Sequence, residues 1–449
     1  MEPATAVRVS CSKQGLHRRM EPVTHFLTGA CLGRAGFNRK TAYATLAAVL
    51  AAEAADLDVL WGLAGPVEEL KRHRGITHTF VAVPVVAGVV VGAVWVLDWW
   101  VTRRRERRNA GPLRQAQGRL STPVAAATSA QEDRLLGESG GFPPFRQEKV
   151  ERMGHGATQN AGPSTPSAAL RSLRMTSESE QRVHWGWLYL TAVVAALSHL
   201  LLDWTNNYGV RPFFPFNPRW YAGSFVFIAE PVLWGLFFLA LVMPWLLGLA
   251  DREIGARKKP FRGQGWAIFA LVGMVTLWCW RWGEHAQGLT MIANTQITRE
   301  PVTRVALEPY PVNPYRWHAI LETQDFYQTA EVNTWTGSID SDPEQDVMYK
   351  PADTPAVVTA KQTPLGRAYL DWGRWAVVRD VGPEPVAGMS PPELAPGRHW
   401  TTVEFSDLRF HYKFLPTQDQ AGRSTLSGWV YIVDGSDDAG EAMGGREQH

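Results

Sequence analysis

The segment that decides the fold is KRHRGITHTFVAVPVVAGVVVGAVWVLDWWV, residues 71–101. From Thr79 to Val101 it is apolar apart from Asp98, which is close to one bilayer crossing of ~20 residues. The cations before this run are typical of a membrane helix anchored at the headgroups. Anchoring does not require histidine, however, so His73 and His78 raise the question of whether they are ligands.

Further apolar runs place the chain among membrane proteins. Three runs resemble the first: Gly186–Thr205, Ser224–Ala250 and Gln264–Trp282. Two weaker runs are Thr24–Gly36 and Thr41–Trp61. Many of the 20 tryptophans lie at the ends of these runs, as expected at a membrane interface. We predict an α-helical membrane bundle of about six helices. A soluble protein with buried helices is the alternative, and the run lengths and aromatic ends disfavour it.

Composition narrows the function classes. The net charge of +2 over 449 residues indicates no nucleic-acid partner. The three cysteines form neither a disulfide framework nor a CxxC pair, and no signal peptide is expected. The oligomeric state is not readable from the sequence.

Domain boundaries follow from changes in composition. After an N-terminal tail (1–22) come the first membrane helices with the HRGITHT motif (23–102) and a segment rich in Ser, Pro and Gly, read as a disordered loop or insertion (103–182). The remaining membrane helices follow (183–282). Residues 283–434 alternate apolar and polar positions between Pro and Gly breaks, which predicts an extramembrane β-rich domain, and 435–449 is read as a disordered tail.

Positive charge predicts the topology. The clusters RRRERR (103–108) and REIGARKKPFR (252–262) should be cytoplasmic. The C-terminal domain is then extracytoplasmic, and we expect a bacterial inner-membrane protein. The same assignment brings ionisable residues to the outer face: His25, Asp56, Asp58, His73, His78, His199, Asp203 and Glu230.

These residue types are the ligands that zinc and other first-row divalent ions prefer. His199 and Asp203 are four residues apart and share one helix face. Each piece alone has an ordinary interpretation. Asp56 and Asp58 fit a solvated helix end, His199 with Asp203 fits a structural hydrogen-bonded pair, and Glu230 fits a paired intramembrane carboxylate. Their joint placement favours a metal site.

The motifs HFLTG, DLD, HRGITHT and SHLLLDWTNNYG occur in this order. The chain from Val23 to Leu249, without the insertion, resembles the YdjM-like family of membrane-bound metal-dependent hydrolases. The resemblance implies a divalent-metal site, and its motif residues correspond to His25, Asp56, Asp58, His73, His78, His199 and Asp203. Ala55 stands where that family usually has proline.

We therefore expect a membrane-bound hydrolase with a divalent cation, zinc in the first instance, that activates water and polarises a phosphoryl or acyl oxygen. Membrane lipid is the expected partner, and a lipid or lipid-linked ester is the expected substrate. Asp58 or Glu230 is the expected general base, while Arg72 and Arg74 meet headgroups or an anionic substrate. The alternative is a non-enzymatic metal-binding membrane sensor or transporter.

Overall fold

The computed structural model describes residues 21–120, 182–253, 263–386, 388–412, 426–435, 437–443 and 446–447. These residues fall into two compact units, one within 1–92 and 183–449 and the other within 93–182. The whole candidate site lies in the first unit.

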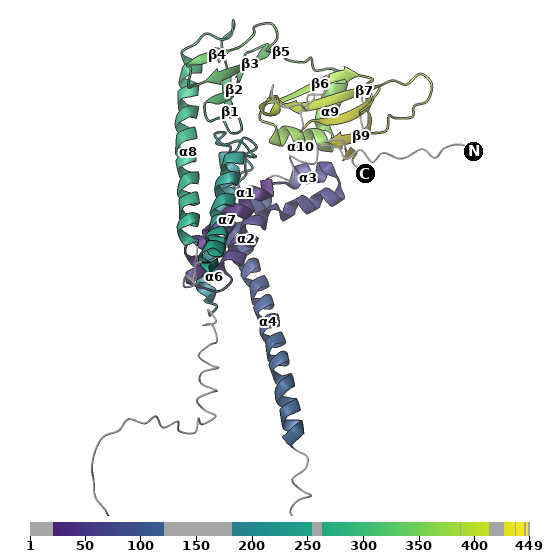
Figure 1. The fold of residues 1–449 in the computed structure, drawn as a ribbon. Coiled ribbons are helices and arrows are strands. Elements are labelled where there is room, and N and C mark those ends of the chain that lie inside the picture. Colours follow the sequence, from purple (N-terminus) through teal and green to yellow (C-terminus); the bar gives the residue numbers. More distant parts are fainter. Residues whose placement is uncertain are drawn as a thin grey trace, which may run out of the picture. The chain divides into compact units, whose positions relative to one another are not determined.

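Helices make up the N-terminal part of the chain (Figure 1). In order they are α1 (Glu21–Ala35), η3 (Phe37–Arg39), α2 (Ala44–Glu53), η4 (Ala55–Ala64), α3 (Pro66–Arg72), η5 (Ile76–His78), α4 (Ala82–Leu120), α6 (Trp185–Thr205), α7 (Pro231–Glu253) and α8 (Gln264–Ala293), where η marks a 3-10 helix.

Four of the described helices are long and apolar enough to cross a membrane: α4, α6, α7 and α8. The other two helices of the predicted bundle are shorter. α1 has 15 residues and α2 has 10, against ~20 for a crossing. α2 contacts both α1 and α6, and α1 also contacts α7 and α8. The two short helices therefore pack among the longer ones and bring their ends close to α6.

Two antiparallel sheets follow. The first contains β1 (Arg304–Pro309), β2 (Arg316–Glu322), β3 (Phe326–Asn333), β4 (Ser338–Asp340) and β5 (Val347–Tyr349). The second contains β6 (Ala376–Gly382), β7 (Trp400–Asp407), β8 (Gly428–Val433), β9 (Asp437–Met443) and β10 (Arg446–Glu447). The helices α9 (Pro355–Gln362) and α10 (Pro364–Trp372) lie between the sheets in sequence, and η6 (Leu408–Phe410) follows β7. The expected C-terminal β-sheet region is present.

Shared apolar cores join the sheets to the helices. Leu307, Trp317 and Val332 of the first sheet belong to one buried cluster with Leu233 of α7 and Met274 of α8. In a second cluster, Val67 and Leu70 of α3 pack with residues of α9, α10, β7 and β8. Burying this apolar area is what holds the C-terminal region against the helical part.

Two segments differ from the predicted boundaries. α4 continues to Leu120, into the part of the chain read as a loop, while residues 121–181 lie outside the described residues. The tail read as disordered contains β9, which pairs antiparallel with β8 across one register shift and buries Ala442 and Met443. Its strand signal is weak because DDAGEAM has no alternating apolar pattern; pairing with β8 supplies the backbone partners. Residues 1–20 of the N-terminal tail also lie outside the described residues.

Candidate metal centre

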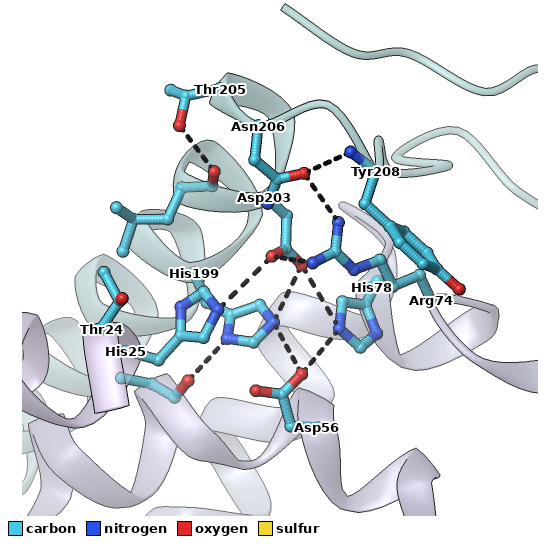
Figure 2. A network of polar contacts seen from close by, with 12 residues as sticks. Thr24, His25, Asp56, Arg74, His78, His199, Asp203, Thr205, Asn206 and Tyr208 are labelled. Carbon is cyan, nitrogen blue, oxygen red and sulfur yellow. Dashed lines mark hydrogen bonds and ion pairs between the residues drawn. The ribbon is translucent and has the colours of Figure 1, made fainter. Parts of the chain in front are cut away.

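Five polar side chains from four elements meet at one point (Figure 2). His25 comes from α1 and Asp56 from the start of η4, where α2 has ended. His78 closes η5, and His199 and Asp203 lie one turn apart on α6. His25 and His199 stack with ring centroids 3.8 Å apart, and His78 lies 4.8 Å from His199 by the same measure.

A sharp turn aims His78 at the cluster. α3 ends at Arg72, Arg74 has a positive φ of 51°, and Gly75 follows. A Cβ on Gly75 would lie 2.7 Å from the carbonyl oxygen of Arg72, which the backbone cannot accommodate without moving. Glycine is therefore required for the chain to reverse here. The turn brings His73 to one carboxylate oxygen of Asp58 and His78 to the other.

Four distances between donor atoms are close to those expected around one metal ion. Four ligands at ~2.1 Å from a tetrahedral ion stand ~3.4 Å apart. His78 Nε2 lies 3.2 Å from Asp56 Oδ1 and 3.4 Å from Asp203 Oδ2. His199 Nε2 lies 3.6 Å from the same Asp56 oxygen and 3.2 Å from the same Asp203 oxygen. His25 Nε2 adds a fifth donor, 3.4 Å from Asp203 Oδ1.

Burial makes this arrangement costly without a cation. His78, His199 and Asp203 are fully buried, and His25 is 3% exposed. Among the described residues, the donor atoms His199 Nε2 and Asp203 Oδ2 have no hydrogen-bond partner. Buried polar atoms are normally satisfied, so these donors fit a bound ion. Two overlapping groups, His25–Asp56–His199 and His78–His199–Asp203, could hold one.

Hydrogen bonds behind the histidines fix their rings. His199 Nδ1 lies 2.6 Å from the carbonyl oxygen of Ala52, and His78 Nδ1 lies 3.3 Å from Asp58 Oδ2. Both contacts direct the Nε2 atom toward the cluster, the usual support for a metal-binding imidazole. Asp58 is itself held, since it accepts hydrogen bonds from Arg74 N at 2.8 Å and from Thr77 Oγ1 at 3.3 Å.

Electrostatics follow the same contacts. Burial by itself raises the pKa of Asp56 and of Asp58, but neighbouring imidazoles outweigh burial and lower both values below the usual range. Burial by itself lowers the pKa of His78, and the two carboxylates outweigh it and raise the value. The carboxylates therefore stay ionised, which is the state that binds a cation.

Residues 20–287 match the family described as the YdjM inner membrane protein. The chain belongs to this family. No curated protein and no solved structure matches it. Membership, together with the four membrane-length helices, makes the chain an integral membrane protein. The match ends within α8, so both sheets lie outside the YdjM region.

Arg74 of the YdjM region is placed behind the cluster. It is fully buried, and its Nη2 lies 2.9 Å from Asp203 Oδ1. Its Nη1 donates to the carbonyl oxygen of Gly209 at 2.6 Å, while its guanidinium lies over the Tyr208 ring. From this position Arg74 can orient Asp203. The sequence had instead suggested that Arg74 contacts the substrate, and its burial disfavours that role. Arg72 instead lies at the surface, 2.7 Å from Glu68.

The other expected residues lie around the cluster or apart from it. His73 Nδ1 is 3.1 Å from Asp58 Oδ1, and its ring lies edge-on to that of His78, with centroids 6.0 Å apart. Glu230 forms a buried ion pair with Arg281 at 2.7 Å and accepts a hydrogen bond from Val312 N. Glu230 and His25 line one cavity of about 20 Å³, large enough for a single water molecule.

The C-terminal region contributes residues that the sequence did not single out. Arg409 is buried, donates to the carbonyl oxygen of Asn207 at 2.8 Å and is held by Asp407 at 2.9 Å. The Tyr412 hydroxyl accepts from Asn207 Nδ2 at 3.2 Å. The NNYG turn that follows Asp203 is thus hydrogen-bonded both by Arg74 and by Arg409 and Tyr412 of the β-sheet region. DLRFHY carries no local signal for this contact, because only the fold brings it to the turn.

Proposed function

We propose that this protein is a membrane-bound metal-dependent hydrolase, with Asp56, His78, His199 and Asp203 as the metal ligands and His25 beside them. The observation that supports this most is the set of four donor distances between 3.2 and 3.6 Å, which are close to the ~3.4 Å between neighbouring ligands of a tetrahedral ion. Zinc is the ion that this mixture of imidazole and carboxylate favours. When bound, such an ion supplies Lewis-acid activation of water and of a phosphoryl or acyl oxygen.

The protein's own residues have separate tasks in this proposal. Arg74 and Asp58 orient the ligands Asp203 and His78. The side chain of Asp56 is 13% exposed and that of His73 is 17% exposed, whereas His78, His199 and Asp203 are closed off. A substrate therefore approaches along the edge formed by Asp56 and His73. Arg72 stands on the neighbouring α3, where it can meet an anionic group.

The substrate class follows from the membrane setting. The site lies at the C-terminal end of α6, where the span gives way to the NNYG turn, so a lipid or lipid-linked ester can present its polar group there. We place the site and the C-terminal region on the extracytoplasmic side because of the basic clusters at 103–108 and 252–262. A reporter fused after the last membrane helix tests this orientation.

Metal analysis with a turnover assay tests the function. Protein purified in lipid nanodiscs should contain a stoichiometric divalent metal and should hydrolyse phosphate or carboxylate ester reporters until a chelator is added. The His78→Ala variant should lose metal and turnover, whereas His399→Ala, which changes a histidine far along the sequence before β7, should keep both. Stoichiometric metal without turnover of any ester would favour the sensor or transporter alternative.

A further inference from the structure

The 3-10 helix η4 presents apolar side chains outward. Five of its ten residues are large and exposed, and they are Leu57 (61%), Val59 (49%), Leu60 (59%), Trp61 (45%) and Leu63 (91%). Of its two acidic residues, Asp58 is buried beside His78, and Asp56 also contacts His78. A segment facing water has the reverse arrangement, and contiguous exposed apolar groups mark an interaction surface.

The C-terminal region does not cover this surface in the described part of the chain. α3, which contacts η4, turns Val67 and Leu70 into the second apolar cluster against α9 and α10. η4 has no large side chain in that cluster. The bent arm made of η4 and α3 can be followed beyond α2 in Figure 1. One side of the arm is therefore packed on protein, and the other is left open.

A second set of exposed apolar residues continues from the arm into a membrane span. Ile76 is 62% exposed, Phe80 49% and Val81 55%, and α4 begins at Ala82. Phe80 N donates to the carbonyl oxygen of Pro212, and the Phe80 ring lies 5.4 Å from Phe213. These residues run directly into α4, a membrane-length helix whose outward side chains would face lipid. We therefore infer that lipid also surrounds the exposed residues before it.

Cations accompany the exposed aromatic ring. The Arg72 guanidinium lies over Trp61, 4.0 Å from the ring centroid, and the side chain of the adjacent Lys71 is 60% exposed. Tryptophan with arginine and lysine at its polar side is the combination found where a segment lies in the headgroup layer. A contact with a second copy of the chain would need no such cations.

We propose that an interfacial surface, made of Leu57, Val59, Leu60, Trp61, Leu63, Ile76 and Phe80, lies in the headgroup–acyl boundary of the leaflet that α4 enters, with bilayer lipid as its occupant. η4 then lies flat in the membrane surface without spanning it. Its first turn carries Asp56, so the open edge of the metal cluster faces lipid headgroups. If the protein has the proposed hydrolase function, on which this point rests, the polar group of a lipid substrate can reach the metal cluster without the lipid leaving the bilayer.

Depth measurement tests the proposal. Nitroxide labels are placed at Leu60→Cys and Leu63→Cys after Cys11 and Cys279 have been changed to serine, because the native Cys31 is buried. Labels at Ser338→Cys and Glu344→Cys are the matched exposed controls. In liposomes, collisions of the Leu60 and Leu63 labels with oxygen should exceed those with a water-soluble nickel complex, and the controls should show the reverse.

Two outcomes would overturn the proposal. One is a Leu63 label as accessible to the nickel complex as the Ser338 label. The other is dipolar broadening at Leu63 that disappears on dilution with unlabelled protein, which would assign the surface to a second copy. The readout is depth and does not involve turnover. Metal content measured on the same samples keeps a failure of the hydrolase proposal separate from a failure of this one.

Discussion

The guanidinium of Arg74 lies 2.9 Å from the carboxylate of Asp203, and both side chains are almost completely buried. Arg74 leaves the turn between α3 and η5, while Asp203 is in the last turn of α6. The pair joins the two segments that supply most of the donors. It also places a cation directly behind a carboxylate that faces His78 and His199.

Arg74→Met should therefore destabilise the metal-free protein strongly. Removing one partner of a buried ion pair leaves an uncompensated charge and costs about 3–5 kcal/mol. A bound cation would neutralise Asp203 in part, so the stabilisation by added zinc should be larger in the variant than in the wild type. Denaturant unfolding in detergent, with and without zinc, measures both quantities. Arg72→Ala, at an exposed pair, should cost about 0–1 kcal/mol, and equal losses for the two variants would contradict the assignment.

Asp58→Asn tests the support of His78. The two carboxylate oxygens of Asp58 contact His73 and His78. The asparagine amide has only one acceptor oxygen and cannot serve both, so we expect the His78 ring to lose its orientation. Loss of such a contact typically lowers metal affinity by about 10–100-fold. Competition with a chromophoric chelator measures the affinity. Asp353→Asn, which alters an exposed pair with Lys361, is the control. Unchanged affinity in Asp58→Asn would mean that His78 is positioned by other contacts.

Tyr412→Phe tests whether the β-sheet region supports the NNYG turn. The variant removes the hydroxyl that accepts from Asn207 and donates to the Pro309 carbonyl oxygen at 3.0 Å. A buried amide left without its partner costs about 1–3 kcal/mol, and we expect a weaker metal affinity as well, since the turn follows Asp203. Tyr349→Phe, at a tyrosine that is 73% exposed, should change neither quantity. Loss of stability with unchanged metal affinity would limit Tyr412 to a structural role.

Glu308 makes stability depend on pH. Burial on β1 raises its pKa to about 7, and Arg409 only partly opposes this. The unfolded carboxyl titrates near 4.3. Between about pH 4.3 and 7 the folded state therefore holds a proton that the unfolded state has lost, and stability falls as pH rises. Melting temperatures at pH 5 and pH 8 should differ less in Glu308→Gln than in the wild type. Glu344→Gln should behave like the wild type, and an unaltered difference in Glu308→Gln would refute the role of this group.

Membrane residence and family membership could be predicted from local patterns. The apolar runs 79–101, 186–205, 224–250 and 264–282 correspond to the four long helices because helix length in a bilayer is set by its thickness. The resemblance carried by HRGITHT and SHLLLDWTNNYG is confirmed by the family match. The bounds of the weaker run Thr41–Trp61 could not be predicted from the sequence. α2 stops after ten residues, and η4 replaces the rest of the expected helix.

The sequence by itself determined which residue types could meet at one end of the membrane helices, because charge and hydropathy act along the chain. Only the tertiary structure decided their separate roles. Asp56 and Asp58 are two residues apart, yet one faces His199 and the other supports His78, because η4 turns them to different sides. Glu230 pairs with Arg281 and Arg74 pairs with Asp203, because a buried charge without a partner is energetically costly. Such pairings depend on distances across the fold, which no local pattern encodes.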